Sequence, residues 1–331
     1  MMLSTDIGID LGTANTLIYE RKKGIILNEP SVIAIDKTTQ KAIDVGTNAY
    51  KILGKEPKNI KIIYPLKKGT IEDADALELM INAFIKKIQI NSTFIKPRVL
   101  ISLSSELTTL EKNIIKEILL KLGARKVYFE SSIKAAAIGT GMNVSKPIAN
   151  MIVDIGGTTT DIGVLSLSDI VKYNSIKVGG TTFDNDIVKY IREKYKILIG
   201  EKTAESLKIN YLNLYKDDNN KIEIKGKNLI TGLPATTYIE KRELKQAVKE
   251  NVNKIVKEII HTLEQIPPEL SADIVEKGIV ITGGCSKIGG LIELINKKTN
   301  VPIFIAEFPL MSVIEGSGIL LNELKLLTED Q

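Results

Sequence analysis

Two similar stretches, DIGIDLGTANTLIYE at residues 6–20 and MIVDIGGTTTDIGVLSL at residues 151–167, decide the fold of this chain. Each begins with a short apolar run that ends in an aspartate, Asp10 or Asp154, and continues through glycine and small polar residues into a second apolar run. This pattern is typical of two antiparallel strands joined by a tight turn. Further strands and then helices are predicted after both copies. An internal duplication is therefore the simplest account, and a chance similarity of two hairpins is the alternative.

Length and composition indicate a soluble protein of two domains. The chain has 331 residues, of which 44% are hydrophobic and 26% are charged, so it is ordinary in composition and too long for one core. Its single cysteine, Cys285, excludes an internal disulfide framework and favours a reducing cytoplasm. The net charge of +5 comes from scattered lysines, so no nucleic-acid partner is expected. No apolar run approaches the ~20 residues of a membrane span, and the N-terminus does not resemble a signal peptide.

The stretch DLGTANT has the properties of an anion-binding turn. A tight turn at Gly12 leaves successive backbone N–H groups facing outward, and glycine permits a close approach of phosphate. Thr13 and Asn15 can add hydrogen bonds, while Asp10 suits a water molecule of hydrated Mg²⁺ better than phosphate itself. The second copy offers the same elements, with Asp154 as its carboxylate. Two such hairpins facing each other across a cleft would hold a polyphosphate and its metal ion.

A third element, ITGGCSK at residues 281–287, follows later in the chain. The apolar residues of this stretch predict a strand that ends in a turn at Gly283–Gly284. A base or ribose could lie flat on the backbone there. Neither a GxxxxGK[ST] nor a GxGxxG motif occurs in the sequence, so a P-loop and a dinucleotide fold are both excluded. Two hairpins followed by this turn, in this order, are a far more specific signal than one hairpin.

These motifs resemble those of the actin/Hsp70/sugar-kinase ATPase superfamily, and within it the MreB family of bacterial actins. Stretches similar to that family include IGIDLGTANTLIY, GIILNEPSVIAID, RKVYFE, MIVDIGG, IGEKTAE, ITGL and ITGG. The resemblance extends over essentially the whole chain. It implies a duplicated actin-like (ribonuclease H-like) α/β fold, a small subdomain inserted in each domain, a nucleotide cleft between the domains, and head-to-tail polymerisation with ATP bound.

The duplication and the resemblance together predict the domain boundaries. Domain I is expected at residues 1–145, with its small subdomain at about 32–68. Domain II is expected at residues 146–331, with its small subdomain at about 188–244. A C-terminal helix at about 315–328 is expected to pack back on domain I.

The resemblance also implies the residues that bind ATP or ADP with Mg²⁺. Asp10 and Asp154 would hold Mg²⁺ through water molecules, and Thr160 and Asp161 are candidate catalytic residues at the end of the second phosphate loop. The implied nucleotide contacts are Gly12, Thr13, Ala14, Asn15, Gly156, Gly157, Thr158 and Thr159 in the two loops, Gly179, Gly180, Glu201 and Lys202 near the ribose, and Gly283 and Gly284 near the adenine or the α-phosphate.

The sequence departs from the family where the attacking water is positioned. The family has Glu-Glu-Pro before Ala-Ala-Ala-Ile-Gly, whereas this chain has Ser131, Ser132 and Ile133. The family's second glutamate is replaced by Ser132, which is shorter and carries no charge to polarise water. We therefore expect ATP binding with slow hydrolysis. Two alternatives stay open: Glu130, whose α-carbon should lie about 6–7 Å from that of Ser132, supplies the carboxylate, or the substitutions are neutral in a fully active ATPase. Thr158 also replaces the third glycine of the second loop.

The stretch KKIQINSTFIKPRV at residues 86–99 contains an apolar pair, Phe94 and Ile95, among cationic residues. Such a pair can insert shallowly into an anionic membrane surface. The alternative is that the two side chains pack beneath their own loop.

The function that these observations predict is that of a cytoskeletal filament subunit. The protein would bind ATP, assemble with itself or with other MreB-like subunits, and organise cell shape, or motility in a wall-less cell. It would lie in the cytoplasm, at the inner face of the cell membrane if Phe94 and Ile95 insert there. A metabolic small-molecule kinase of the same superfamily is the alternative, although no sequence block supplies the catalytic aspartate that it needs.

Overall fold

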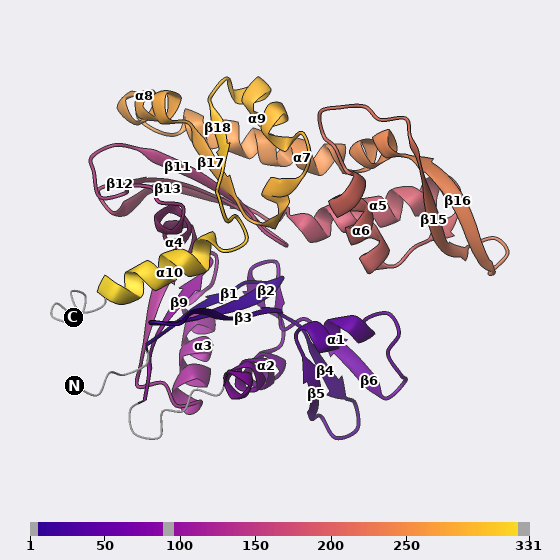
Figure 1. Ribbon diagram of the computed structural model, residues 1–331, viewed down its shortest axis with the longest axis horizontal. Helices are drawn as coiled ribbons and strands as arrows, with labels where there is room; N and C mark the ends of the chain where they lie inside the picture. The colour runs from indigo at the N-terminus through magenta and orange to yellow at the C-terminus, as the bar shows by residue number, and fades with distance from the viewer. Residues whose placement is uncertain (1–5, 89–95, 324–331) are drawn as a thin grey trace. The chain divides into compact units, whose positions relative to one another are not determined.

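The chain folds into two compact units, and each is described by itself. Unit 1 comprises residues 1–144 and 310–331, and unit 2 comprises residues 145–309. The computed structural model in Figure 1 describes residues 6–88 and 96–323. Each unit has its own apolar core.

Unit 1 is built on a five-stranded sheet in the order β10-β9-β1-β2-β3. The first three strands along the chain form an antiparallel meander, while β9 and β10 run parallel to β1. The strands are β1 (Ile7–Leu11), β2 (Asn15–Glu20), β3 (Gly24–Pro30), β9 (Arg98–Leu103) and β10 (Lys126–Ser131).

Four longer helices belong to unit 1: α2 (Ala74–Lys87), α3 (Thr109–Lys121), α4 (Ser132–Gly139) and α10 (Ser312–Glu323). The apolar faces of α2 and α3 pack against the sheet core. Helix α2 begins at Ala74, because the Asp73 carboxylate accepts a hydrogen bond from the Ala76 N–H and caps the helix there.

A small second sheet in unit 1 lies within the segment predicted as a small subdomain, about 32–68. Its strand order is β5-β4-β6, and a small buried cluster of Val32, Ala34 and Ala49 lies beneath it. Its elements are β4 (Ile33–Asp36), β5 (Ala42–Val45), α1 (Thr47–Ile52) and β6 (Ile60–Ile63), followed by the short pair β7 (Leu66–Lys67) and β8 (Thr70–Ile71).

Unit 2 repeats the sheet of unit 1, in the order β13-β12-β11-β17-β18. Again three strands form an antiparallel meander and two further strands run parallel to the first. The strands are β11 (Asn150–Ile155), β12 (Thr160–Ser166), β13 (Asp169–Ile176), β17 (Ile279–Thr282) and β18 (Ile303–Ile305). The duplication predicted from the two aspartate hairpins is therefore confirmed by the topology.

The remaining elements of unit 2 are helices and a small sheet in the order β14-β15-β16. The helices are α5 (Gly180–Tyr195), α6 (Glu201–Tyr211), α7 (Lys241–Glu264), α8 (Pro268–Lys277) and α9 (Leu291–Thr299), with a 3-10 turn at Gly284–Lys287. The small-sheet strands are β14 (Ile197–Leu198), β15 (Lys221–Asn228) and β16 (Pro234–Glu240), and they lie within the predicted small subdomain of about 188–244.

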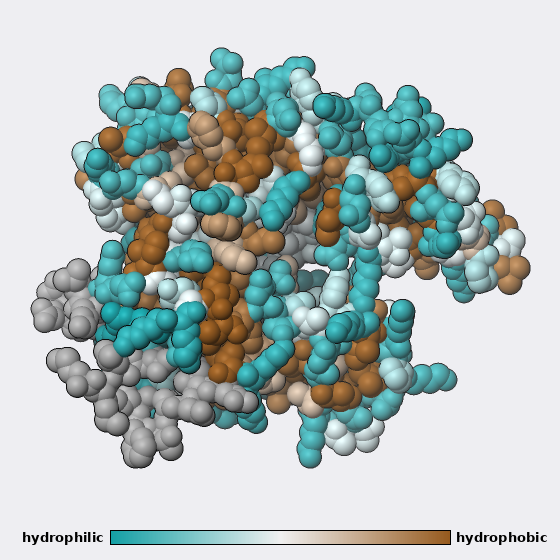
Figure 2. Space-filling view, viewed as in Figure 1, coloured by the Kyte–Doolittle hydropathy of each residue, from teal (hydrophilic) through white to brown (hydrophobic). Residues whose placement is uncertain are grey.

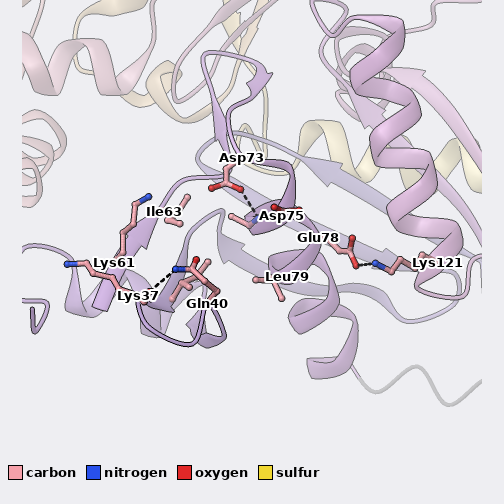
Figure 3. A pocket seen from close by; sticks show the side chains of 11 residues that line it. Lys37, Gln40, Lys61, Ile63, Asp73, Asp75, Glu78, Leu79 and Lys121 are labelled. Atoms are coloured by element: carbon pink, nitrogen blue, oxygen red, sulfur yellow. Dashed lines mark hydrogen bonds and ion pairs between the residues drawn. The ribbon is translucent and has the colours of Figure 1, made fainter. Parts of the chain in front are cut away.

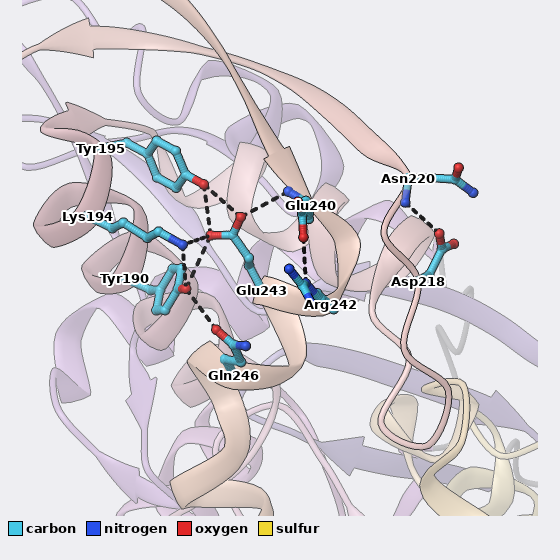
Figure 4. Close-up of polar contacts among 9 residues, drawn as sticks. All are labelled: Tyr190, Lys194, Tyr195, Asp218, Asn220, Glu240, Arg242, Glu243 and Gln246. Atoms are coloured by element: carbon cyan, nitrogen blue, oxygen red, sulfur yellow. Dashed lines mark hydrogen bonds and ion pairs between the residues drawn. The ribbon is translucent and has the colours of Figure 1, made fainter.

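Glu243 joins the end of α5 to the start of α7 (Figure 4). Its carboxylate accepts hydrogen bonds from Lys194 Nζ at 2.6 Å and from the Tyr195 hydroxyl at 2.7 Å. Although burial acts to raise the pKa of Glu243, the hydrogen bonds from Lys194 and Tyr195 hold it below its ordinary value. The contact fixes the small sheet to the body of unit 2, because β16 leads directly into α7.

None of the described helices is long and apolar enough to cross a lipid bilayer.

Candidate functional site

The β1–β2 turn of unit 1 has the tight geometry that the sequence predicts. A β-carbon on Gly12 would lie 2.7 Å from the carbonyl oxygen of Asn15, so no other residue fits there without a backbone shift. Ser31, which is fully buried, supports the turn from below. Its hydroxyl donates to the Gly12 carbonyl at 2.6 Å and its N–H donates to the Ala14 carbonyl at 2.9 Å. Ser31 was not predicted as part of this turn, because β2 and β3 separate it from Gly12 in the sequence.

Asp10 is the penultimate residue of β1, just before this turn. Burial raises the pKa of its carboxyl from 3.8 to about 7. A cation beside a desolvated carboxylate stabilises the charged form, and a carboxylate oxygen is a ligand that Mg²⁺ accepts, directly or through water. Asp10 therefore fits the metal-ligand assignment chemically. Within residues 6–88 and 96–323, no group of three or more Asp, Glu, His or Cys side chains is arranged to hold a metal ion.

In unit 2 the β11–β12 turn is closed by a hydrogen bond from the Gly156 N–H to the Thr159 carbonyl at 2.9 Å. The Gly179–Gly180 segment lies directly against this turn. The Gly180 N–H donates to the Gly156 carbonyl at 3.0 Å. A β-carbon on Gly179 would lie 2.7 Å from the Gly156 oxygen and 2.8 Å from the Thr158 nitrogen. The structure thus brings together two glycine segments that the sequence predicted separately.

The three threonines of the turn, Thr158, Thr159 and Thr160, have different environments. Thr158 and Thr159 are half-buried, while Thr160 is fully buried. The Thr160 hydroxyl donates to the Val178 carbonyl at 2.8 Å inside the core. Thr160, predicted as a candidate catalytic residue, therefore supports the hairpin from within, whereas Thr158 and Thr159 lie half-buried at the turn itself. Ile162 and Val164 lie in the core, and Thr160 is on the same face of the strand because side chains alternate with a period of two. This pattern could have predicted that the Thr160 side chain points inward.

The Gly283–Gly284 turn lies beside the same hairpin. Strand β17 pairs with β11 in parallel, with Thr282 opposite Asp154. Gly283 has a φ of +82°, which favours glycine, and a β-carbon there would overlap the Asp154 carboxylate. Gly284 is exposed and begins the 3-10 turn. Asp154, the penultimate residue of β11, is thus held against the backbone of the Gly283 turn.

A buried polar cluster behind Gly180 was not predicted from the sequence. Lys208 Nζ donates to Asp184 Oδ2 at 2.8 Å and to the Gly180 carbonyl at 3.1 Å. The other carboxylate oxygen of Asp184 is buried with no hydrogen-bond partner in the described structure. Burial raises the pKa of Asp184 to about 6, and the charge of Lys208 opposes the shift. Burial likewise raises the pKa of the neighbouring Cys285 thiol to about 12, so this thiol stays protonated.

Glu201 and Lys202 begin α6, close to this cluster. The negative charge of Glu201, with that of Glu205 one turn later, contributes to the raised pKa of Asp184. Glu201 is exposed and Lys202 half-buried. The predicted ribose contacts, the glycine segment and the hairpin turn are therefore neighbours in unit 2.

Ser131 and Ser132 stand where strand β10 becomes helix α4. The neighbouring carboxylate of Glu130 is already engaged: Oε1 accepts from the Ser131 N–H at 2.8 Å and Oε2 lies 3.4 Å from Lys134 Nζ. Ser131 shares a hydrogen bond of 3.2 Å with Ser105. Turning Glu130 toward the position of Ser132 would therefore compete with these two contacts.

A separate pocket in unit 1 lies between the small sheet and the start of α2 (Figure 3). The pocket is lined by acidic and basic side chains, and most of them already have a partner. Lys121 forms an ion pair with Glu78, and Lys37 Nζ donates to the Lys58 carbonyl at 2.6 Å. The Asp73 carboxylate caps α2. None of the residues predicted to bind nucleotide lines this pocket.

Comparison with known proteins agrees with this geometry. The sequence profile of the MreB/Mbl protein family matches residues 4–329. The cell shape-determining protein Mbl of Bacillus subtilis is 45% identical over 327 residues, 98% of both chains. The cell shape-determining protein MreB of Escherichia coli is 42% identical over 324 residues, 96% of this chain and 93% of its own.

Solved structures give the same result. MreB5 of Spiroplasma citri bound to AMPPNP matches with a TM-score of 0.93 at 36% identity, covering 100% of this chain and 99% of its own. The same protein bound to ADP matches with a TM-score of 0.94. The subunit of the MamK double helical filament shares the fold, with a TM-score of 0.82 at 18% identity over 97% of this chain and 99% of its own. The actin-like fold predicted from the sequence is confirmed, and the chain belongs to the MreB/Mbl protein family.

Proposed function

We propose that this protein is a bacterial actin-like cytoskeletal subunit that binds ATP with Mg²⁺, hydrolyses it slowly, and assembles head to tail into filaments that organise cell shape. The observation that carries the proposal is the packing of Gly179 and Gly180 on the Gly156–Thr159 turn, next to Asp154 and Gly283. The family relationship supports the same reading, because its relatives bear names of cell shape-determining proteins. None of the compared proteins favours the kinase alternative.

Nucleotide binding is supported by the chemistry of the two turns and by the S. citri relatives, which were solved with AMPPNP and with ADP. The turn around Gly12 and the turn around Gly156 would contact phosphates. Asp184 pairs with Lys208, whose Nζ also donates to the Gly180 carbonyl, so the pair holds the backbone beside the predicted ribose contacts. Asp10 and Asp154 would hold Mg²⁺ through water, and that ion would neutralise phosphate charge.

Slow hydrolysis is supported by the local structure at Ser132. A hydroxyl replaces a carboxylate there, and Glu130 is held by Lys134 and by backbone. The chain therefore keeps the elements that bind nucleotide and lacks the charged group that would polarise the attacking water.

Head-to-tail assembly is supported by two exposed surfaces of unit 2. The turn of the β15–β16 hairpin carries Leu229, Ile230 and Leu233, and Ile230 is 80% exposed; Figure 2 shows apolar side chains at the end of this hairpin. The outer face of β15 beside it is mainly basic, with Lys221, Lys225 and Lys227 against one acid.

Helix α8, at the opposite end of unit 2 (Figure 1), presents the complementary chemistry. Val275 is 59% exposed there, and the helix also exposes two acids, Glu269 and Glu276, and one base, Lys277. The β15–β16 hairpin of one copy would meet helix α8 of a second copy. A contact between two different surfaces of this kind is heterologous. Such contacts generate filaments when they do not close into rings.

Membrane contact and a cytoplasmic location complete the proposal. Phe94 and Ile95, the apolar pair expected to insert, lie outside the described residues. Of the cations near them, Lys87 pairs with Glu29, and Arg98 donates to Asp6 at 2.6 Å. Lys86 and Lys96 are exposed, and their charge is available to attract an anionic lipid surface.

The experiment that tests the proposed function is ultracentrifugal pelleting of the purified protein with ATP–Mg²⁺, with ADP–Mg²⁺ and without nucleotide, beside a direct binding titration with a fluorescent ATP analogue. We expect saturable binding and polymer in the pellet with ATP. A protein that binds ATP but transfers its phosphate to a small acceptor without forming polymer would support the kinase class instead.

A further inference from the structure

A chain of three side chains crosses the second hairpin of unit 2. The Tyr173 hydroxyl donates to Asp161 Oδ1 at 2.6 Å, and the Thr159 hydroxyl donates to Asp161 Oδ2 at 3.0 Å. Asp161 is only 7% exposed, whereas Thr159 and Tyr173 are half-buried. One buried carboxylate therefore connects a tyrosine on β13 to the threonine of the turn.

The strand register explains why the tyrosine reaches the aspartate. Strands β12 and β13 are antiparallel, with Asp161 opposite Ser175 and Gly163 opposite Tyr173. Asp161 and Gly163 are two residues apart and share a face of the sheet. Because Gly163 has no side chain, the ring of Tyr173 can extend over it to its diagonal neighbour, a distance that aromatic side chains span.

The direction of the hydrogen bonds sets what Thr159 presents at the surface of the turn. Both hydroxyls donate to Asp161, so both hydroxyl hydrogens point toward its carboxylate. The hydroxyl proton of Thr159 is thus engaged, and the lone pairs of its oxygen remain to accept a hydrogen bond from a water molecule. Tyr173 donates to the other oxygen of Asp161. This second hydrogen bond fixes the orientation of the carboxylate to which Thr159 donates.

We propose that Tyr173 is a positioning residue for ATP hydrolysis, which acts through Asp161 to orient the Thr159 hydroxyl toward the attacking water. The inference rests on the proposed function. In the reaction the water oxygen bonds to the terminal phosphorus, the bond from that phosphorus to the bridging oxygen breaks with its electron pair leaving on ADP, and the water proton passes to the released phosphate. Thr159 accepts a hydrogen bond from the water and takes no proton. This contact does not depend on the carboxylate that Ser132 lacks.

The test is Tyr173→Phe, which removes one hydroxyl and keeps the ring. We expect the kcat of phosphate release to fall about fivefold, with KM, the affinity for the ATP analogue and the polymer mass unchanged, because an interaction that matters only in the transition state lowers kcat alone. Tyr195→Phe is the matched control. It removes a tyrosine hydroxyl that also donates to a buried carboxylate of unit 2, that of Glu243, and it should leave kcat unchanged.

A double-mutant cycle tests whether Tyr173 acts through Thr159. Thr159→Val should lower kcat, Thr159→Ser should retain it, and adding Tyr173→Phe to Thr159→Val should cause no further loss, since coupled residues are not additive. If Tyr173→Phe does not fold, Asp161→Asn tests the same connection. We expect it to lower kcat and to leave the affinity for the ATP analogue unchanged.

An unchanged kcat in Tyr173→Phe or Asp161→Asn would overturn the inference. So would losses of kcat that add up in the double variant of Tyr173 and Thr159, or a loss of kcat in Tyr195→Phe as large as that in Tyr173→Phe. If release by the wild type is too slow to measure, the same variants are compared in the Ser132→Glu background, and no measurable release there also overturns it. A wild type that neither binds the ATP analogue nor pellets with ATP refutes the proposed function itself, so the two failures are distinguishable.

Discussion

Gly316 of helix α10 lies directly over the carbonyl group of Ala135 in helix α4, with no room for a β-carbon between them. The contact is reciprocal, because a β-carbon on Gly139 of α4 would overlap the Ser312 carbonyl of α10. These glycines allow two helices from distant parts of the chain to pack backbone against backbone. Helix α4 begins at Ser132, so α10 fixes the helix that starts at the serine proposed to replace the water-positioning carboxylate.

Gly316→Ala should therefore destabilise unit 1. The added methyl group would force the helices apart, and overpacking of this kind costs about 1–3 kcal/mol. Urea denaturation measures the loss in the free energy of unfolding. Ile319→Ala, at an exposed position of the same helix, is the control and should change stability little. Equal stability of the two variants would contradict the close packing of α4 and α10.

Asp184 should make the stability of the protein depend on pH. Its folded pKa of about 6 lies above its ordinary value of 3.8, so the folded state binds more protons between these values and loses stability as the pH rises from about 4 to about 6. Asp184→Asn does not titrate. The free energy of unfolding of the variant, relative to the wild type, should increase over this range by at most about 3 kcal/mol and stay constant above pH 7, because one pKa unit corresponds to about 1.4 kcal/mol.

Urea denaturation of both proteins at pH 4, 5, 6 and 7 measures this difference. The variant leaves Lys208 buried without its partner, so it is expected to be less stable overall, and the prediction concerns only the change with pH. A constant difference across the range would show that Asp184 is ionised throughout.

Ser132→Glu should raise the rate of phosphate release by about tenfold or more, because it restores a carboxylate that can polarise the attacking water. Release is measured under polymerising conditions at equal polymer mass, with Ser131→Glu as the neighbouring control. If the wild type already releases phosphate rapidly and Ser132→Glu changes nothing, another group positions the water and our interpretation of the serines is wrong.

Ile230→Asp should prevent polymer formation without unfolding the subunit. The side chain lies at the exposed end of the β15–β16 hairpin, and a charge there would be desolvated in the proposed contact with α8 of the next copy. Pelleting with ATP measures the loss. Leu167→Asp, which alters another exposed leucine of unit 2, should still pellet. Normal pelleting of Ile230→Asp would place the contact elsewhere.

Charge reversal offers a second test of the same contact. Glu276→Lys should weaken assembly, and Lys227→Glu combined with Glu276→Lys should recover part of it if the two ends meet. A double variant that pellets no better than Glu276→Lys would argue against this pairing.

Phe94→Ser with Ile95→Ser should abolish binding to vesicles that contain anionic lipid, since both apolar anchors are removed. Co-sedimentation with such vesicles is the measurement, and neutral vesicles are the control for the electrostatic part. Unchanged pelleting of the double variant with anionic vesicles would indicate that the two side chains pack beneath their loop.

Local sequence patterns predicted the two aspartate hairpins correctly. Both are read from apolar runs that alternate with glycine and small polar residues, and the strands β1–β2 and β11–β12 form there. Glycine at positions 12 and 283 marks turns whose backbone leaves no space for a side chain. Such features depend on neighbours within a few residues, which the sequence displays directly.

The sequence by itself determined the duplicated fold, the family and the positions of the two glycine turns, because these follow from periodicity, turn chemistry and motif order. Only the tertiary structure decided which side chains serve each turn. Lys208 meets Gly180 across 28 residues, Ser31 supports Gly12, and Tyr173 reaches Asp161 over the gap left by Gly163. Those contacts depend on strand register and on packing between distant elements, and no local pattern specifies them.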